Sequence, residues 1–345
     1  MQDEEFMRAA LAEARRGLGR TSPNPAVGAA IVRSGKIVAR GYHHRAGLPH
    51  AEIEALRALP KPALAKGATI YVTLEPCSTH GRTPPCVNAI IAAGLRRVVI
   101  GTIDPNPAHA GHGVEILRAA GIAVTTGVME KECRELNVAF NHWIVTKLPL
   151  VIAKAGMSLD GRLTRPPGEG QWLTNAVARK DAHQLRAQVD AILVGAETVR
   201  RDNPRLTVRG VRGARQPWRI VMTRSGNLPK DAHLFTDEHR ERTLVYRGKS
   251  LRAVLRDLGK RQITSVMIEG GGGVLGEAFD RRLVQRAHFY VAPLLCGGPA
   301  VVLSGRGVGS NAEAATIRDA TYTRLGDNLR LTGEVEYPAE ISPVA

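Results

Sequence analysis

The feature that most restricts the fold is an alternation of short apolar runs with stretches of helical periodicity along the first half of the chain. Such alternation is typical of a layered α/β fold, because helices that alternate with strands pack on the faces of one sheet. The apolar runs predict strands at residues 28–39, with a pair turned at Ser34-Gly35, and at 68–74 and 98–103. The helical patterns fall at residues 3–16, 50–59, 87–93 and 114–120.

A second series of apolar runs begins near Pro149, after a helical pattern over residues 130–142. With 345 residues, the chain exceeds the size at which one hydrophobic core usually stops growing. We therefore expect two domains, residues 1–147 and 148–345, that meet around Lys147-Leu148-Pro149. In the second domain, strands are predicted at residues 150–155, 191–194, 219–222, 243–246, 265–269, 288–295 and 329–335.

The composition is that of a soluble globular protein, with 43% hydrophobic and 23% charged residues. No apolar run reaches the roughly 18 residues of a membrane span, so we expect no membrane association. The acidic start, Met1-Gln2-Asp3-Glu4-Glu5, lacks the basic and apolar stretches of a signal peptide. We therefore expect a cytoplasmic location, where cysteines more often bind metal or react than form disulfides. The four cysteines are Cys77, Cys86, Cys133 and Cys296.

The chain is strongly basic, with a net charge of +16 from 48 basic and 32 acidic residues. This charge favours anionic partners, which include phosphorylated metabolites, dinucleotides and nucleic acid. A general richness in arginine explains it equally well. Aromatic residues make up only 4%, so stacking platforms for single strands are sparse and we expect no nucleic-acid partner. A homo-oligomer is expected, because enzymes of this size commonly form symmetric assemblies.

Three separate segments carry residues that bind zinc in proteins. Pro49-His50-Ala51-Glu52 begins a predicted helix, Glu75-Pro76-Cys77 ends a predicted strand, and Cys86 begins another helix nine residues after Cys77. One imidazole and two thiolates make a three-ligand zinc site whose fourth position stays open for water. That open position distinguishes a catalytic site from a structural one.

The same segments predict the chemistry of the site. Both cysteines lie next to predicted helix N-termini, where the helix dipole favours the thiolate. Zinc lowers the pKa of bound water, and Glu52 is placed to take its proton and deliver it to a leaving amine. His-x-Glu followed by Pro-Cys and a second cysteine is the signature of zinc deaminases. Each residue alone has an ordinary structural explanation, but the ordered set favours a deaminase.

Longer segments around these residues resemble one family, the bifunctional deaminase/reductase enzymes of riboflavin biosynthesis. Nucleoside and tRNA deaminases usually carry Cys-x-x-Cys, so the long step from Cys77 to Cys86 separates them from this family. The matching segments are Pro23-Asn24-Pro25-x-Val27-Gly28, Gly41-Tyr42-His43-x-x-Ala46-Gly47-x-Pro49-His50-Ala51-Glu52, Thr73-Leu74-Glu75-Pro76-Cys77-Ser78-x-x-Gly81-Arg82-Thr83-Pro84-Pro85-Cys86 and Asp104-Pro105-Asn106-Pro107.

The resemblance continues to about residue 335. It implies an α/β protein with an N-terminal cytidine-deaminase-like three-layer sandwich and a C-terminal dihydrofolate-reductase-like domain that uses NADPH. The matching segments of the second half are Lys154-x-Gly156-x-Ser158-Leu159-Asp160-Gly161-Arg162, Trp172-Leu173-Thr174, Leu185-Arg186-Ala187 and Ala196-x-Thr198-Val199-x-x-Asp202-x-Pro204-x-Leu206-Thr207-x-Arg209.

A glycine turn after the strand at residues 265–269 has its own physical meaning. Gly270-Gly271-Gly272-Gly273 precedes a helical pattern from Val274, so free backbone N–H groups and a positive helix end face one region. Consecutive glycines differ from the dinucleotide fingerprint of parallel α/β folds, and a purely structural turn is an alternative.

The family resemblance also implies site residues. Arg186 and Arg209 suit phosphate, because guanidinium forks match phosphate oxygens, although arginines in so basic a chain are often solvated. Gly170 replaces a serine often found in the family, which leaves only its backbone for a contact. The implied NADPH contacts are Gly156, Trp172, Thr198, Asp202, Gly271, Gly272, Gly273, Val274, Leu275, Gly276 and Glu277. The implied substrate contacts are Asn24 and Arg82 in the deaminase and Gly170, Arg186, Leu206, Arg209 and Glu269 in the reductase.

The resemblance implies two reactions in sequence. A 2,5-diamino-6-(5-phosphoribosylamino)pyrimidin-4-one loses its C2 amino group by zinc-dependent hydrolysis, and NADPH then reduces the ribosyl group to give 5-amino-6-(5-phosphoribitylamino)uracil. Lys154, Asp202 and Glu269 are the candidates for proton delivery in the reduction, and the sequence does not choose among them. Three alternatives stay open: a tRNA-type nucleic-acid deaminase with an accessory domain, a reductase with a degenerate first domain, and a non-enzymatic zinc-binding module.

Overall fold

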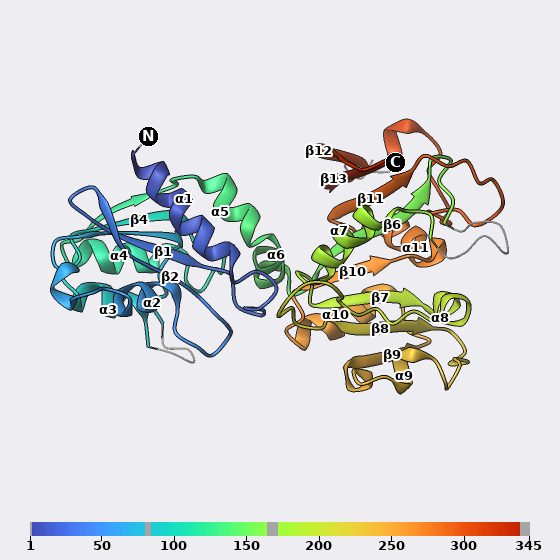
Figure 1. Cartoon of the computed structure of the whole chain (residues 1–345), viewed down its shortest axis with the longest axis horizontal. Coiled ribbons are helices and arrows are strands. Elements are labelled where there is room, and N and C mark those ends of the chain that lie inside the picture. The colour runs from blue at the N-terminus through green and yellow to red at the C-terminus, as the bar shows by residue number, and fades with distance from the viewer. Residues whose placement is uncertain (1, 80–83, 164–171, 339–345) are drawn as a thin grey trace, which may run out of the picture. The chain divides into compact units, whose positions relative to one another are not determined.

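The computed structural model describes residues 2–79, 84–163 and 172–338. The chain divides into two compact units, Met1–Lys147 and Leu148–Ala345, each built around its own sheet (Figure 1). Among the described residues, no helix has both the length and the apolar character needed to cross a membrane.

The first unit contains a five-stranded mixed sheet in the order β2-β1-β3-β4-β5. The β1–β2 hairpin and the β1–β3 pair are antiparallel, whereas β3, β4 and β5 run parallel. The strands are β1 (Gly28–Arg33), β2 (Lys36–Tyr42), β3 (Thr69–Leu74), β4 (Arg97–Thr102) and β5 (Ala123–Thr126).

Helices cover both faces of this sheet (Figure 1). Along β1, Ala29 and Ile31 pack into one buried cluster, and Ala30 and Val32 pack into another that includes Phe6 of the N-terminal helix. This period of two is what a strand between two apolar layers requires, so the predicted three-layer arrangement is confirmed. The helices are α1 (Gln2–Arg15) and α5 (Glu130–Leu136) on one face, with α2 (Ala51–Arg57), α3 (Cys86–Ala92) and α4 (His112–Ala119) on the other; the short η1 is Pro62–Leu64.

The single helix predicted over residues 130–142 is wrong, because α5 ends before Asn137 and α6 (Val138–Thr146) begins after it. Asn137 has a non-helical backbone, with φ −115° and ψ 24°. Its buried side chain accepts from the Ala26 N–H at 2.7 Å and donates to the Ala26 carbonyl at 2.9 Å. This pairing with a residue 111 positions away competes with helix continuation.

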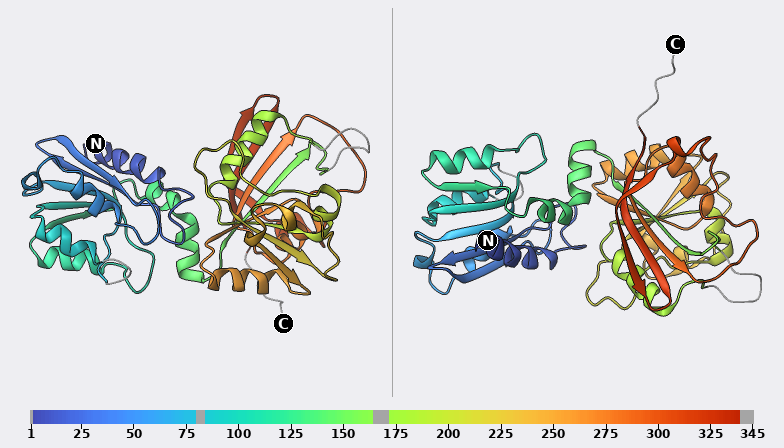
Figure 2. Two further views of the ribbon diagram at one scale, coloured as in Figure 1. Left: turned by 60° about the horizontal axis from the view of Figure 1, so that its bottom comes forward. Right: turned by 90° about the horizontal axis from the view of Figure 1, so that it is seen from above.

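The second unit contains an eight-stranded sheet in the order β12-β13-β11-β6-β10-β7-β8-β9. All neighbours are parallel except β11–β13 and β12–β13, so an antiparallel hairpin forms one edge, as the views in Figure 2 show. The strands are β6 (Leu150–Ser158), β7 (Ala191–Gly195), β8 (Trp218–Thr223), β9 (Thr243–Arg247), β10 (Ser265–Glu269), β11 (Arg286–Ala292), β12 (Thr316–Leu325) and β13 (Asn328–Glu336).

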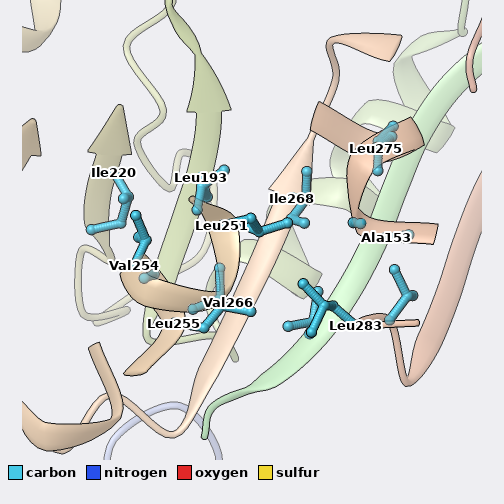
Figure 3. Packing of buried hydrophobic residues seen from close by; sticks show 14 of the residues in the cluster. Ala153, Leu193, Ile220, Leu251, Val254, Leu255, Val266, Ile268, Leu275 and Leu283 are labelled. Carbon is cyan, nitrogen blue, oxygen red and sulfur yellow. The ribbon is translucent and has the colours of Figure 1, made fainter. Parts of the chain in front are cut away.

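Helices also cover both faces of the second sheet. On one face, apolar residues of α10 and α11 pack with strand residues such as Val266 and Ile268, as Figure 3 shows. On the other face, Ala178 and Ala182 of α7 pack against Tyr290 of β11, whose neighbour Phe289 faces the first cluster. The helices are α7 (Ala176–Arg186), α8 (Ala196–Asp202), α9 (His233–Thr236), α10 (Leu251–Lys260) and α11 (Gly272–Asp280), with short turns η2 (Arg240–Arg242) and η3 (Asn311–Glu313).

Candidate active sites

His50, Cys77 and Cys86 come together at the ends of three elements in the first unit. His50 is the residue just before α2, Cys77 lies three residues after β3, and Cys86 is the first residue of α3. The His50 Nδ1 atom lies 3.5 Å from the Cys77 Sγ and 3.3 Å from the Cys86 Sγ. The three donor atoms lie within 4.8 Å of one another, so one ion can contact all three.

These separations fit a tetrahedral zinc ion. With zinc bonds of about 2.3 Å to sulfur and about 2.0 Å to nitrogen, tetrahedral angles place a sulfur and a nitrogen donor about 3.5 Å apart. The two measured separations from the His50 nitrogen are 3.5 and 3.3 Å. A set of one nitrogen and two sulfur donors is also what zinc prefers. The residues therefore fit a zinc ion, and among the described residues no fourth His, Cys, Asp or Glu joins the group.

Cys77 lies in the loop after β3, and the prediction that it is next to a helix N-terminus is confirmed in space. The helix end acts on it through space, because the Cys86 N–H at the start of α3 donates to the Cys77 Sγ at 3.3 Å. Hydrogen bonding with Cys86, against the effect of burial and with help from His50, lowers the pKa of the Cys77 thiol to about 4. The same contact, together with burial, raises the pKa of the Cys86 thiol.

Glu52 is buried beside the three donors. It is the second residue of α2, only 3% exposed, and it interacts with the Cys86 side chain. Burial, opposed by the nearby His50 charge, raises the pKa of its carboxyl group to about 7. A carboxyl group with a pKa near neutrality is suited to take up and release a proton during one turnover.

Gly41 explains how α2 comes close enough to place both His50 and Glu52. A Cβ atom at Gly41 would collide with the Ala55 nitrogen and would lie 2.6 Å from the Ala51 carbonyl oxygen. Only glycine therefore lets β2 and α2 approach to backbone contact at this position.

Asn24 lies in a hydrogen-bonded chain that ends next to the three candidate zinc ligands. The His43 Nδ1 atom lies 3.0 Å from the Pro49 carbonyl and therefore donates, so its Nε2 accepts from the Asn24 amide at 3.1 Å. The His43 and His50 rings meet edge to face, with centroids 5.2 Å apart. The side chain of Asn24, a predicted substrate contact, is thus oriented by His43, while Arg82 lies outside the described residues.

Glu75 has a structural role that the sequence prediction missed. Its two carboxylate oxygens accept four backbone N–H groups at distances from 2.9 to 3.3 Å, and these come from Asp104, Gly111, Gly113 and Val114. The carboxylate thus binds the start of α4 and the loop before it, only two residues from Cys77. Its place in the segment Glu75-Pro76-Cys77 was the sole hint in the sequence, because the partners lie 29 to 39 residues away.

A second buried site lies at the carboxyl end of β10. Glu269 ends this strand and pairs in register with Lys154 of β6. The Lys154 Nζ lies 2.7 Å from one carboxylate oxygen, and Arg186 of α7 lies 2.8 Å from the other. Burial acts to raise the pKa of Glu269, but the charges of Arg186 and Lys154 lower it to about 2. Glu269 is therefore ionised at neutral pH.

The positive charge around Glu269 exceeds the single negative charge. Burial lowers the pKa of the Arg209 guanidinium, the charges of Arg186 and Arg205 lower it further, and the charge of Glu269 acts in the opposite direction. Burial and the same arginines lower the pKa of His183 to about 4, so this imidazole is neutral. Three basic side chains, Lys154, Arg186 and Arg209, lie around one carboxylate. Such a region favours an anion such as a phosphate.

Arg186 is already occupied in this arrangement. Its guanidinium binds Glu269 through Nε at 2.9 Å and through Nη2, and its Nη1 donates to the Thr207 carbonyl at 2.9 Å. The Arg209 Nη1 donates to the Thr207 hydroxyl at 3.2 Å. The next predicted substrate residue, Leu206, is buried and has a positive φ of 52°. Gly170 lies outside the described residues.

The glycines of the turn after β10 differ in their surroundings. Gly270 and Gly271 adopt left-handed φ angles of 76° and 77°, and the Thr198 hydroxyl lies 3.2 Å from where a Cβ of Gly271 would be. In the part of the chain that the structure describes, nothing lies within 4 Å of a Cβ at Gly273. The predicted cofactor residues Thr198, Gly271 and Gly273 therefore share one region.

Other glycines in this segment face the protein itself. A Cβ at Gly272 would collide with the Val301 carbonyl, and one at Gly276 would collide with the Gly305 nitrogen. The Leu275 side chain is fully buried in the core (Figure 3). The structure thus gives these three positions a packing role, and any cofactor contact there must use the backbone.

The remaining predicted cofactor residues are more dispersed. Gly156 lies in β6, and a Cβ there would be 3.3 Å from Thr174. Trp172 is 54% exposed with Arg179 over its ring, and Glu277 pairs with Arg281. Val274 would lie 3.0 Å from a Cβ at Gly195, and burial raises the pKa of Asp202 at the end of α8.

Known proteins resemble both units. Residues 1–102 match the cytidine and deoxycytidylate deaminase zinc-binding region, and residues 149–331 match the RibD C-terminal domain. Riboflavin biosynthesis protein RibD of Aquifex aeolicus is 39% identical over 347 residues, covering 95% of this chain and 97% of the relative. The protein of the same name from Escherichia coli is 43% identical over 333 residues, covering 87% and 90%.

Solved structures agree with the sequence relatives. Acinetobacter baumannii RibD matches with a TM-score of 0.89 at 35% identity, covering 97% of this chain and 99% of that one. A Thermotoga maritima structure described as a diaminohydroxyphosphoribosylaminopyrimidine deaminase/5-amino-6-(5-phosphoribosylamino)uracil reductase matches with a TM-score of 0.88 at 35% identity and the same coverage. The predicted fold class and family resemblance are confirmed. This chain belongs to the RibD family, the bifunctional deaminase and reductase enzymes of riboflavin biosynthesis.

Proposed function

We propose that residues 1–147 form the deaminase and residues 148–345 form the reductase of this bifunctional enzyme. The observation that carries the first assignment is the His50, Cys77 and Cys86 set, whose spacing suits zinc. The second assignment is supported by the match of residues 149–331 to the RibD C-terminal domain. The substrate of the first step would be a 2,5-diamino-6-(5-phosphoribosylamino)pyrimidin-4-one.

In the deaminase, His50, Cys77 and Cys86 would hold zinc. When bound, zinc supplies a Lewis acid that makes water a nucleophile near neutral pH. Glu52 would take the proton of the attacking water on its carboxylate and give it to the departing amino group of the pyrimidine C2. Asn24, with its amide oriented by His43, would hold the pyrimidine ring. Ammonia and the uracil are the products.

In the reductase, the backbone N–H groups of the turn at Gly271 and Gly273 would bind phosphate oxygens of NADPH. When bound, NADPH supplies the hydride that converts the ribosyl group to ribityl. Arg209 is the better candidate for the substrate phosphate, because Arg186 already binds Glu269 and Thr207. Arg186 would position the Glu269 carboxylate and the backbone at Thr207.

The proton for the reduction would come from Lys154. Glu269 is a poor acid at neutral pH because its pKa is about 2. The Lys154 ammonium carries protons and is held at 2.7 Å by Glu269. Asp202 stays the second candidate, because burial raises its pKa.

The test uses the purified full-length chain with zinc, NADPH and the diamino-pyrimidinone phosphate. Ammonia release and NADPH oxidation should occur in equal amounts. Glu52→Gln should slow ammonia release by about 100-fold or more, because it removes the proton carrier. NADPH oxidation by the same variant should stay normal when the uracil intermediate is supplied directly. Unchanged ammonia release by Glu52→Gln would contradict the proposal, as would faster turnover on tRNA or single-stranded DNA.

We further propose that this chain acts on its small-molecule substrate without nucleic acid, as a homo-oligomer in the cytoplasm. The four free cysteines, two of them needed as zinc ligands, suit a reducing compartment. Light scattering of the purified protein and cell fractionation test the last two points.

A further inference from the structure

Residues 205–209 form a segment between α8 and β8 that carries Leu206 and Arg209. Leu206 has a positive φ of 52°, a conformation that is strained for a bulky side chain. Its side chain is nevertheless buried. A strained backbone persists only where its surroundings hold it in place. The contacts of this segment show what holds it.

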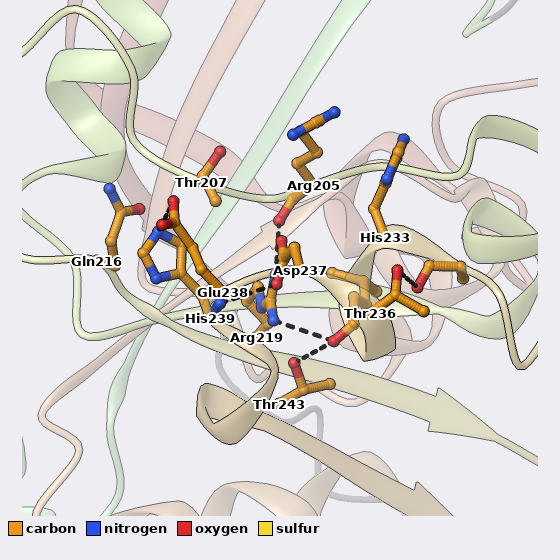
Figure 4. A network of polar contacts seen from close by, with 12 residues as sticks. Arg205, Thr207, Gln216, Arg219, His233, Thr236, Asp237, Glu238, His239 and Thr243 are labelled. Carbon is orange, nitrogen blue, oxygen red and sulfur yellow. Dashed lines mark hydrogen bonds and ion pairs between the residues drawn. The ribbon is translucent and has the colours of Figure 1, made fainter.

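The first anchor is Arg219 of β8, which is 1% exposed. Its Nη1 donates to the Arg205 carbonyl at 3.3 Å and to the Asp237 carboxylate at 2.6 Å, and its Nη2 donates to the Leu234 carbonyl at 3.0 Å (Figure 4). A buried cation paired in this way fixes the backbone on one side of Leu206.

The second anchor is Gln216, which lies just before β8 and near Thr207 in Figure 4. Its Oε1 accepts from the Val208 N–H at 2.8 Å, and its Nε2 donates to the Val208 carbonyl at 3.1 Å. One side chain therefore satisfies both backbone groups of a single residue, as a neighbouring strand would. This fixes the segment on the other side of Leu206.

The opposite edge of the segment is bound by the charged site itself. The Thr207 carbonyl accepts from Arg186, and the Arg209 N–H donates to the His183 Nδ1 at 3.2 Å. Residues 205–209 are thus held by two sets of residues. Arg219 and Gln216 bind the backbone of Arg205 and Val208, and Arg186 and His183, which lie beside Glu269, bind the backbone of Thr207 and Arg209. A shift of the segment would move Leu206 and Arg209 relative to Lys154 and Glu269.

We propose that Gln216 is a positioning residue of the reductase: it holds Leu206 and Arg209 where they receive the phosphorylated sugar, and Arg219 anchors the other end. This inference rests on the proposed function of the second unit. Gln216 acts through Val208, so its loss should weaken substrate binding and leave cofactor binding intact. A purely structural Gln216 would change folding stability alone.

The test compares Gln216→Met with a matched control, Gln285→Met, in the full-length chain. Gln285 also binds backbone, because its Oε1 accepts from the Val151 N–H at 2.8 Å, but it lies just before β11, at the opposite end of the sheet's strands from Glu269. The readouts are kcat and KM for 5-amino-6-(5-phosphoribosylamino)uracil, the Kd for NADPH, thermal stability, and ammonia release by the first unit. Arg219 is fully buried, so replacing it would mainly report on folding, and Gln216 is the sharper probe.

Gln216→Met should raise the KM for the uracil substrate by about tenfold or more, because small displacements of binding groups are costly. The Kd for NADPH and the rate of ammonia release should stay within about twofold of the unsubstituted protein. Gln285→Met should lower thermal stability without raising the KM. If Gln216→Met leaves the KM unchanged, or if both variants raise it equally, the inference is overturned.

Arg209→Ala separates this inference from the proposed site. If Arg209→Ala raises the KM and Gln216→Met does not, the substrate site stands and the positioning role fails. If neither variant changes the KM, the segment does not bind substrate and both proposals fail. If only Gln216→Met raises it, the proposed phosphate role of Arg209 fails, and the positioning role stands for Leu206 alone.

Discussion

Lys154 and Glu269 face each other across the β6–β10 pair, with the lysine Nζ 2.7 Å from a carboxylate oxygen. The pair is mostly buried, with side chains 14% and 10% exposed. Arg186 forms a second ion pair with Glu269, through the other carboxylate oxygen. Because buried charges need partners, removing one member leaves the others uncompensated. This site therefore couples the stability of the second unit to its chemistry.

Glu269→Gln should destabilise the second unit at neutral pH by roughly 3–5 kcal/mol, because Lys154 and Arg186 lose their counter-ion. The pKa of Glu269 falls from an ordinary 4.5 to about 2 on folding, so its ionisation stabilises the fold above about pH 4.5. That stabilisation is lost as the pH falls from about 4.5 to about 2. The gap in unfolding free energy between the two proteins should therefore narrow over this range, as measured by urea unfolding.

The control for this prediction is Glu334→Gln. Glu334 pairs with Arg286 and Arg318, but its side chain is 38% exposed. Exposed ion pairs contribute about 0–1 kcal/mol, so this change should have a small effect at every pH. A Glu269→Gln variant as stable as the Glu334→Gln variant would contradict the prediction.

Zinc binding to the first unit should release at least one proton per ion at neutral pH. In the metal-free site, the lowered pKa of Cys77 makes it a thiolate, while the raised pKa of Cys86 keeps its proton. Zinc needs both thiolates, so the Cys86 proton must leave. Titration calorimetry in two buffers of different ionisation enthalpy measures the number released.

Cys296→Ser is the matched control for proton release, because Cys296 lies in the second unit, outside the predicted zinc site. It should release as many protons as the unsubstituted chain. Cys86→Ser should bind zinc more weakly and release fewer. Binding without proton release in the unsubstituted chain would show that Cys86 is already a thiolate.

The cluster of His50, Cys77 and Cys86 could be predicted because each of these residues lies in a short segment at the end of an element. The sequence around His50, Cys77 and Cys86 contains both the ligand and the strand or helix end that places it. The alternating apolar runs likewise predicted nearly all the strands that pack between helices. Such features depend on neighbouring residues and are visible locally.

Other features depended on distant contacts or lacked an apolar pattern. The outer strand β12 has mostly exposed residues, so no apolar alternation marks it. The helix break at Asn137 depends on hydrogen bonds to Ala26. The hydrogen bonds between Gln216 and Val208 form only because the chain reverses direction between them. The packing role of Gly272 and Gly276 depends on residues 301–305, about thirty positions later. These contacts exist only once the chain has folded.

Gly272→Ala and Gly273→Ala should differ in stability although the residues are adjacent. A Cβ at Gly272 would collide with the Val301 carbonyl, and overpacking of this kind costs about 1–3 kcal/mol. A Cβ at Gly273 would meet nothing within 4 Å, and alanine favours the helix by up to about 1 kcal/mol. Thermal unfolding of the two variants tests this difference. If Gly272→Ala is as stable as Gly273→Ala, Val301 moves aside easily and the prediction is wrong.

Glu75→Gln should weaken zinc binding and loosen the start of α4, although Glu75 is not a ligand. Its carboxylate accepts four N–H groups, whereas an amide offers one oxygen and turns an NH₂ group towards the remaining donors. Outer partners of a metal site commonly change affinity by about 10- to 100-fold, and a similar loss is expected here because Cys77 is two residues away. Competition with a chromogenic chelator measures the affinity. Glu115→Gln, an exposed change on the same helix, should leave it unchanged. If both variants bind zinc as tightly as the unsubstituted chain, the Glu75 carboxylate supports α4 without supporting the metal site.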